Sequence, residues 1–383
     1  MGKGCEFILQ LRGRRREDNI EMDKNLILSI CIPTHNRAKE TMELIEECLK
    51  INARDIEICV TDQNSTDGTV DRVKELKDER IRVVLNDEPM IGYFNMVQSI
   101  YNAKGKYALY INDRDILDYK KVNLLIELLR EREFAFLKCC ERNKTTNGRL
   151  NVYHNVFESL IEYSFSNHPT GLVFNRELIE EHISRDEIFY YEHPREVYYW
   201  DFLARELFKF GKTAIWNNGL WWQRSSQYLK SNKSGVASDQ TKVYFLPQNR
   251  ILQMKQVMYQ IFEKSTFQIS EDEKFAVAKK IIDDVSDCAG GYKWGIGDYA
   301  QCGHYGLHKK YISLFQRLKI DLATAKNMAE FMKKRGYPDK WIDYQKSYLK
   351  NHFINLVKSD FRMNLSMIKR DIKGIIETTR RKK

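Results

Sequence analysis

Long apolar runs are missing from this sequence of 383 residues. A helix that crosses a bilayer needs about 20 consecutive apolar residues, and no stretch approaches that length. The N-terminal stretch MGKGCEFILQLRGRRRED holds only a short apolar segment, which does not fit a signal peptide, and Glu6 breaks the N-myristoylation pattern. The sequence therefore predicts a cytoplasmic protein without a membrane span.

Cysteine patterns that bind metal are also missing. The sequence has 8 cysteines, but none of them forms a CxxC pair or a Cys/His cluster with zinc spacing. We therefore expect reduced thiols in the cytosol. No internal repeat is visible either, which excludes a repeat architecture.

The overall composition is that of a folded protein with an anionic partner. Hydrophobic residues make up 43% and aromatic residues 12%, enough for a sizeable core, and the length suits two or three structural units. The net charge is +10, which suggests phosphate, nucleic acid or an acidic membrane surface as a partner. Most of the excess is in residues 358–383, which hold nine basic and three acidic residues.

Predicted strands and helices alternate along the first part of the chain. The strands lie at 26–32, 55–62, 81–86, 106–112 and 134–140, and the helices at 38–52, 67–76, 93–103 and 119–132. Alternation with short connections predicts an α/β fold, with a mostly parallel sheet covered by helices on both faces. After a polar stretch at 230–235, the sequence reads as helical to its end.

Three polar clusters directly follow predicted strands: Pro33–Arg37, Asp62–Gly68 and Asn112–Asp115. The carboxyl ends of parallel strands meet at one edge of a sheet, where α/β proteins bind their ligands. The sequence therefore predicts a binding site built from these three clusters.

Two of these clusters resemble a known family. The segments SICIPTHNRA (29–38) and EICVTDQNSTDGT (57–69) are similar to the paired motifs of the family 2 glycosyltransferases, which have the GT-A fold. Gln63 and Asn64 depart from the second motif. The segments AKGKYALYI (103–111) and PTGLVFNRELI (169–179) are also similar to the family, so the resemblance covers about residues 26–225.

The resemblance implies transfer of a sugar from a nucleotide-sugar donor, with a UDP-sugar favoured, to a glycan or lipid-linked glycan acceptor. It implies inversion at the anomeric carbon and a role in cell-surface polysaccharide synthesis. The alternative is a catalytically degenerate GT-A protein that acts as a binding or scaffold module. A nucleotidyltransferase would need a glycine-rich loop, which PTHNRAKE lacks, and no nucleic-acid-binding motif is present, so no nucleic-acid partner is expected.

The donor site implied by the resemblance contains several residues from the strand ends. They are Pro33, Thr34, Asn36, Arg37, Asp62, Ser65, Gly92, Asn95 and Asn112. Asp62 would accept a hydrogen bond from the nucleotide base, although an aspartate there also suits a turn. For Asp67 the sequence favours a helix cap over a ligand.

The segment Asn112-Asp113-Arg114-Asp115 aligns with the family's metal-binding D-x-D, but in a shifted register that puts Arg114 on the usual ligand position. Asp113 and Asp115 have the spacing to hold Mg²⁺ or Mn²⁺ through oxygen ligands. Alternatively, Arg114 binds the diphosphate in place of a cation. A third interpretation is that Arg114 is only paired with its neighbours in a turn. Asp113 and Arg114 are catalytic candidates in the first two interpretations.

An inverting transferase needs a base that takes the proton of the acceptor hydroxyl. Asp201, in YYWDFLARELFKFGK (198–212), has the placement that the resemblance implies for this base. Glu192 and Glu196 are alternatives, and Asp201 also suits a structural role on its helix. The aromatic segment GLWWQ (219–223) is predicted to be core rather than a sugar platform.

The expected domain organisation follows from the resemblance. Residues 1–25 are predicted to be a disordered extension, with Met22 as a candidate start. Residues 26–118 are the nucleotide-sugar-binding half, 119–230 the acceptor-side half, and 236–383 a helical accessory region. In residues 358–383, apolar side chains recur every three or four positions, so a basic amphipathic helix can lie on an anionic membrane surface or pack on the protein. The protein is therefore a candidate peripheral protein of the inner membrane face.

Overall fold

The computed structural model describes residues 22–23, 25–86, 92–163, 168–184, 199–224, 247–297 and 314–347. The chain divides into two compact units. The first consists of residues up to 241 together with 259–270, and the second consists of 242–258 and 271–383. Residues 358–383, in which the sequence predicts an amphipathic helix, lie outside the described residues.

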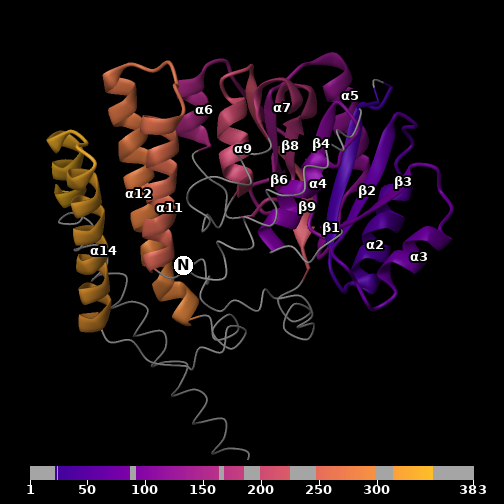
Figure 1. Cartoon of the computed structure of the whole chain (residues 1–383), viewed down its shortest axis with the longest axis horizontal. Helices are drawn as coiled ribbons and strands as arrows, with labels where there is room; N and C mark the ends of the chain where they lie inside the picture. Colours follow the sequence, from indigo (N-terminus) through magenta and orange to yellow (C-terminus); the bar gives the residue numbers. More distant parts are fainter. Residues whose placement is uncertain are drawn as a thin grey trace, which may run out of the picture. The chain divides into compact units, whose positions relative to one another are not determined.

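A nine-stranded mixed sheet forms the centre of the first unit (Figure 1). The strand order is β3-β2-β1-β4-β8-β6-β9-β5, and β7 also pairs with β9. The strands are β1 (Leu28–Thr34), β2 (Ile56–Asp62), β3 (Ile81–Leu85), β4 (Tyr107–Tyr110), β5 (Asp115–Leu117), β6 (Phe136–Glu141), β7 (Leu150–Tyr153), β8 (Leu172–Asn175) and β9 (Thr213–Gln223).

Helices connect these strands and cover the sheet. They are α2 (Ala38–Leu49), α3 (Thr69–Glu75), α4 (Gly92–Tyr101), α5 (Tyr119–Glu131), α6 (Val156–Glu162), α7 (Arg176–His182) and α9 (Tyr199–Leu207). The predicted alternation of strands and helices is confirmed over the first half of the chain.

The parallel part of the sheet is β3-β2-β1-β4. Every residue of β1 and β2 is buried, as expected for parallel strands covered on both faces. The second half of the sheet mixes directions, because β8 runs antiparallel to both β4 and β6, while β6 and β9 are parallel. The α/β fold class is therefore confirmed, but the prediction of a mostly parallel sheet is wrong: the described sheet is mixed, because β8 is antiparallel to both its neighbours and β5 and β7 are antiparallel to β9. The parallel arrangement is concentrated in the half that carries the paired sequence motifs.

The two faces of the parallel half differ in chemistry. One face is apolar, with Leu44 of α2 and Leu125 of α5 in the same buried cluster as Ile30 of β1. On the other face, Glu57 of β2 accepts hydrogen bonds from Ser29 Oγ (2.6 Å) and from the backbone N–H of Lys104 (2.6 Å). Because these partners satisfy the buried carboxylate, the polar network is compatible with the core.

The second unit is helical where it is described. It contains α11 (Pro247–Tyr259, whose last residue belongs to the first unit), α12 (Glu271–Gly297) and α14 (Leu314–Lys334). The Tyr344 hydroxyl donates to Asp283 of α12 at 2.9 Å. Burial and this carboxylate raise the pKa of Tyr344 to about 12. Among the described helices, none combines the length and apolar character needed to cross a membrane.

A short π-helix, η2 (Gln260–Lys264), belongs to the first unit and lies against α9. Gln260 accepts from Arg205 Nε at 2.6 Å and donates to Glu206 Oε1 at 2.6 Å. This buried network connects α9 to a segment that follows it by more than fifty residues. The position of α9 therefore depends on a part of the chain that the sequence assigned to the helical accessory region.

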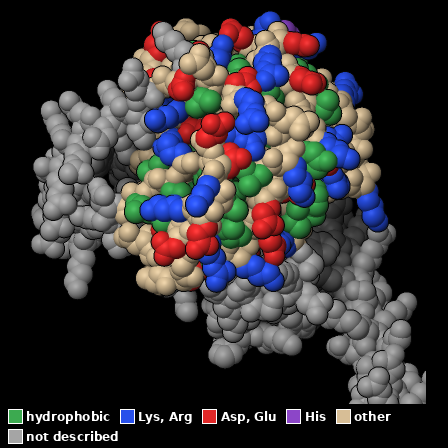
Figure 2. All heavy atoms as spheres, turned by 90° about the vertical axis from the view of Figure 1, so that its right-hand side faces the viewer, with side chains coloured by type: hydrophobic (Ala, Val, Ile, Leu, Met, Phe, Trp, Pro, Cys, Tyr) green, Lys and Arg blue, Asp and Glu red, His purple; other side chains and the backbone are tan. Residues whose placement is uncertain are grey.

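Figure 2 shows the face of the first unit that lies on the right in Figure 1, where β3 and α3 are. Basic and acidic side chains alternate over this face. In the described part of the first unit, oppositely charged side chains form ion pairs at or below 3.3 Å, among them Arg54–Glu79 and Arg130–Asp55. The charge on this face is therefore mixed rather than a single basic patch.

Candidate active site at the carboxyl edge of the sheet

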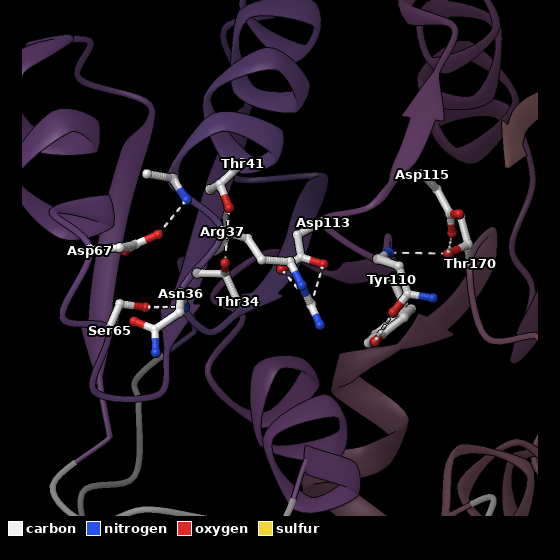
Figure 3. Close-up of polar contacts among 12 residues, drawn as sticks. Thr34, Asn36, Arg37, Thr41, Ser65, Asp67, Tyr110, Asp113, Asp115 and Thr170 are labelled. Atoms are coloured by element: carbon white, nitrogen blue, oxygen red, sulfur yellow. Dashed lines mark hydrogen bonds and ion pairs between the residues drawn. The ribbon is translucent and has the colours of Figure 1, made fainter. Parts of the chain in front are cut away.

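The three polar clusters predicted from the sequence meet at one edge of the parallel half. Thr34 at the end of β1 is in register with Asp62 at the end of β2, and β4 lies on the other side of β1. Figure 3 shows side chains from the loops after β1, β2 and β4 beside one another. The sequence prediction of a shared site at these strand ends agrees with this arrangement.

The loops after β1 and β2 are joined by hydrogen bonds through Asn36. Its backbone N–H donates to Ser65 Oγ at 2.8 Å, and its side-chain Oδ1 accepts from the backbone N–H of Thr66 at 2.7 Å. Asn36 has a φ of 52°, in the left-handed region that asparagine tolerates better than most residues. Two predicted donor-site residues, Asn36 and Ser65, therefore hold the loops together.

Asp67 joins the same two loops at the start of α2. Its Oδ2 accepts from the backbone N–H of Ala38 at 2.9 Å, and its Oδ1 accepts from the backbone N–H of Thr69 at 3.1 Å. Partial burial raises the pKa of Asp67, but the hydrogen bonds from Thr69 and Ala38 outweigh it and hold the pKa below its usual value. Asp67 is not itself an N-cap residue, since the N-caps are Arg37 for α2 and Gly68 for α3. It nevertheless satisfies the first backbone N–H of both helices, so the predicted helix-end role holds in this wider form.

Asp62 is 1% exposed and forms a local turn. Its Oδ1 accepts from the backbone N–H of Ser65 at 2.8 Å, and its Oδ2 accepts from Ser65 Oγ at 2.5 Å. Asp62 therefore has the turn-forming role that the sequence offered as an alternative to base binding. Each carboxylate oxygen has further acceptor capacity, so this turn does not prevent a contact with a nucleotide base.

The other predicted donor-site residues at β1 are also buried or paired. The Thr34 hydroxyl lies 2.8 Å from that of Thr41 on α2, and Pro33 is paired with Thr61 in the sheet. On α4, Asn95 Oδ1 accepts from Asn86 Nδ2 at 2.7 Å, next to the end of β3. Gly92 is the first residue of α4. Thr34 and Asn95 therefore hold the ends of β1 and β3 against α2 and α4 through side-chain hydrogen bonds.

Arg37 forms an ion pair with Asp113 across the edge of the sheet. Its Nη1 lies 2.7 Å from Oδ1 and 2.9 Å from Oδ2 of Asp113. The side chains are 11% and 2% exposed. The loop after β1 is thereby connected to the loop after β4, which the sequence did not predict.

The loop after β4 is a tight turn in which Asp115 N–H donates to the Asn112 carbonyl at 3.0 Å. Asn112 accepts from the Tyr110 hydroxyl at 3.0 Å, and its backbone N–H donates to Thr170 Oγ1 at 3.0 Å. Burial, and then the nearby Asp113 and Asp115 carboxylates, raise the pKa of Tyr110 well above its usual value. The phenol therefore stays protonated and serves as a donor.

Asp115 bonds to residues that the sequence did not select. Its Oδ2 lies 2.6 Å from His168 Nε2 and also accepts from the Thr170 hydroxyl. The His168 ring stacks on Trp221 at a centroid distance of 4.8 Å. The predicted core role of Trp221 is confirmed, since it is 5% exposed and donates to the Cys139 carbonyl. The only sequence signal was the segment PTGLVFNRELI (169–179), which contains Thr170 and directly follows His168.

Asp113 and Asp115 do not form a shared ligand set. Figure 3 shows Asp113 turned toward Arg37 and Asp115 turned toward Thr170. Among the described residues, no group of three or more His, Cys, Asp and Glu side chains is arranged to hold a metal ion. The side chains as they are placed do not fit a divalent cation between these two carboxylates.

Asp201 lies on α9 and is 1% exposed. The Tyr163 hydroxyl donates to its Oδ1 at 2.6 Å. Tyr163 was not identified from the sequence, because its contact with Asp201 joins positions 38 residues apart. The alternative base candidates Glu192 and Glu196 lie outside the described residues.

Comparison of the sequence and the fold with known proteins shows which class of protein has this fold and this site. Residues 29–186 match the family model "Glycosyl transferase family 2". In structure, the chain is similar to S. aureus TarS 1-349 in complex with UDP, with a TM-score of 0.53 over 88% of this chain and 92% of that one, at 12% identity. Residues 29–186 thus carry a family 2 glycosyltransferase domain, and the fold is the GT-A fold.

Curated relatives match the same part of the chain. A chondroitin synthase of Pasteurella multocida is 27% identical over 126 residues, which are 32% of this chain and 13% of that protein. The E. coli UDP-Glc:alpha-D-GlcNAc-diphosphoundecaprenol beta-1,3-glucosyltransferase WfaP is 28% identical over 112 residues, which are 29% of this chain and 44% of that protein. The chain therefore spans only a part of the relatives it matches.

Proposed function

We propose that this protein transfers a sugar from a UDP-sugar to a glycan or lipid-linked glycan, with inversion, in the synthesis of a cell-surface polysaccharide. The observation that carries the proposal is the meeting of the Thr34, Asp62 and Asn112 strand ends at one edge of a family 2 domain. Relatives named as polysaccharide synthases and as a lipid-linked glucosyltransferase support the acceptor class. A similar structure that contains UDP supports the nucleotide.

In the proposed reaction, the acceptor hydroxyl oxygen attacks the anomeric carbon of the donor. A new carbon–oxygen bond forms while the bond between that carbon and the diphosphate oxygen breaks, and the electron pair stays on the diphosphate. Asp201 takes the hydroxyl proton as general base. Tyr163 positions Asp201 by donating a 2.6 Å hydrogen bond to its Oδ1.

The donor is assigned to the edge formed by the β1 and β2 loops. Asp62 accepts the N–H of the base, and the Asn36–Ser65 bonds keep the two loops at a fixed separation for it. The protein is placed at the inner face of the cell membrane, with the basic segment 358–383 as its contact with anionic lipid.

The first test is release of UDP from UDP-glucose and UDP-N-acetylglucosamine by the full chain, with the anomeric configuration of the early product read by NMR. Inversion gives a β product from an α-linked donor. Asp201→Asn is expected to lower turnover at least about 100-fold and leave UDP affinity unchanged, because proton acceptance typically contributes 10²–10⁴-fold. Asp339→Asn, an exposed acid of the second unit, is the matched control.

The alternative, a GT-A scaffold without catalysis, predicts a different outcome. It requires UDP binding without turnover, or no nucleotide binding at all, with every donor tested. Wild-type turnover that disappears in Asp201→Asn and persists in Asp339→Asn would exclude it.

A further inference from the structure

The carboxylate at Asp113 is already neutralised by the protein. Arg37 Nη1 contacts both of its oxygens, at 2.7 and 2.9 Å, and the Asp113 side chain is only 2% exposed. A divalent cation on the remaining lone pairs of this carboxylate would meet the positive charge of the guanidinium at close range. Asp113 is therefore committed to Arg37 rather than to a metal.

The carboxylate at Asp115 is held as well. Its side chain is 5% exposed and its Oδ2 lies between His168 Nε2 and the Thr170 hydroxyl. These contacts turn Asp115 away from Asp113, as Figure 3 shows. Oxygen ligands of Mg²⁺ or Mn²⁺ must converge on one point, and these two carboxylates diverge.

Arg114 is the remaining charged group of the turn. It lies between the two aspartates and is half-buried, and its side chain forms no hydrogen bond or ion pair with any residue that the structure describes. Its charge acts on the buried Tyr110 phenol, whose pKa it lowers against the stronger effects of burial and the two carboxylates. The third sequence interpretation, an Arg114 paired with its neighbouring aspartates, therefore does not hold, because those aspartates bond to Arg37, His168 and Thr170.

We propose that Arg114 binds the diphosphate of the nucleotide donor and that this protein transfers sugar without a divalent cation. This inference rests on the function proposed above. The electron pair released from the anomeric carbon is placed on a diphosphate oxygen, and the guanidinium neutralises that charge in the position where the family uses a metal. A planar guanidinium is suited to this role because two of its N–H groups can bind two phosphate oxygens at once.

The assignment also explains the Arg37–Asp113 ion pair. Asp113 acts as a positioning residue, since its contacts with Arg37 connect the loop after β4 to the loop after β1. The turn bond from Asp115 N–H to the Asn112 carbonyl, at 3.0 Å, sets the backbone of Arg114. Within the described part of the chain, Arg114 is thus a cation of this turn that forms no hydrogen bond or ion pair.

The test is calorimetric titration of the full chain with UDP and with uridine, in EDTA and in Mn²⁺. The wild-type protein is expected to bind UDP equally well in both conditions and more tightly than uridine. Arg114→Gln is expected to weaken UDP binding about tenfold or more and to leave uridine binding unchanged, because charge-assisted bonds exceed neutral ones in strength. Arg114→Lys should recover part of the loss. Arg132→Gln, an exposed arginine at the end of α5, is the matched control and should bind like wild type.

Two results would overturn the inference: UDP binding that requires Mn²⁺, or UDP affinity that is unchanged in Arg114→Gln. In either case uridine and UDP still bind, so the proposed function stands. A wild-type protein that binds neither uridine nor UDP in either condition would instead overturn the proposed function. The EDTA comparison needs no variant, so it remains decisive if Arg114→Gln does not fold.

Discussion

Arg37 and Asp113 form a nearly buried ion pair in which one guanidinium nitrogen contacts both carboxylate oxygens, at 2.7 and 2.9 Å. The pair joins loops that follow different strands and are separated by 76 residues in the chain. Through this contact, Asp113 of the Asn112–Asp115 segment, which the sequence predicts to bind a metal, is bonded to Arg37.

Removing one member of this pair is expected to cost more than removing both. Asp113→Asn removes the negative charge of a nearly buried ion pair and should lower the free energy of unfolding by about 3 kcal/mol. The double variant Arg37→Met, Asp113→Asn removes both charges and should recover a large part of that loss. Urea unfolding of the wild type, both single variants and the double variant gives the coupling energy. Additive losses would show that the pair is not coupled.

Gly171 is expected to tolerate no side chain. It has a φ of 87°, and an added Cβ would lie 2.3 Å from the Cys139 carbonyl oxygen and 2.5 Å from Trp221 Nε1. Gly171→Ala should therefore lower the free energy of unfolding by roughly 3 kcal/mol or more, from backbone strain and overpacking together. Gly148→Ala is the control, because Gly148 has a φ of 75° but no atom within 4 Å of the added Cβ. It should lose only about 1 kcal/mol, and equal losses would contradict the packing argument.

Asp67 is expected to stabilise the protein through the start of α2. Asp67→Ala removes the acceptor of the Ala38 and Thr69 backbone N–H groups and should cost about 1 kcal/mol, the usual effect of losing a cap. Asp71→Ala, an exposed aspartate within α3, is the control. The measurement is thermal unfolding in parallel. A loss no greater than that of the control would show that these hydrogen bonds contribute nothing.

Glu206 is expected to make stability depend on pH. Burial raises its pKa, but hydrogen bonds from Lys209, Ser265 and Gln260 outweigh burial and hold the pKa below its usual value. Because the folded pKa is depressed, the contribution is present above the unfolded value of about 4.3 and is lost as the pH falls through the folded pKa. The stability difference between wild type and Glu206→Gln should therefore be largest near pH 7 and shrink below about pH 4. Urea unfolding across this range measures it, and a constant difference would rule out the assignment.

The basic segment 358–383 is expected to bring the protein to anionic membranes. A chain that ends at Lys358 should lose binding to vesicles that contain phosphatidylglycerol, since it lacks most of the positive charge and the apolar stripe of this segment. Flotation of the full and shortened chains makes the comparison, with neutral phosphatidylcholine vesicles as the control. Undiminished binding by the shortened chain would refute this anchor.

The α/β fold and the place of the site could be predicted from local patterns in the sequence. The strands β1 and β2 are mainly apolar, with Ser29 and Glu57 as polar members, and each is followed by a polar cluster, so the shared edge follows from local pattern and from the geometry of parallel strands. The bond from Thr69 N–H to Asp67 was also local, because an aspartate just before a helix satisfies free backbone N–H groups at short range, whereas the bond from Ala38 N–H joins positions 29 residues apart.

Only the tertiary structure decided the partners of the charged side chains. Arg37 with Asp113, Asp115 with His168, and Tyr163 with Asp201 join positions 76, 53 and 38 residues apart. No local pattern encodes such pairs, because they depend on the order of the strands and on the antiparallel pairing of β8 with β4. That order leaves both aspartates of the NDRD segment bonded within the protein and Arg114 available, which the spacing of the sequence alone could not establish.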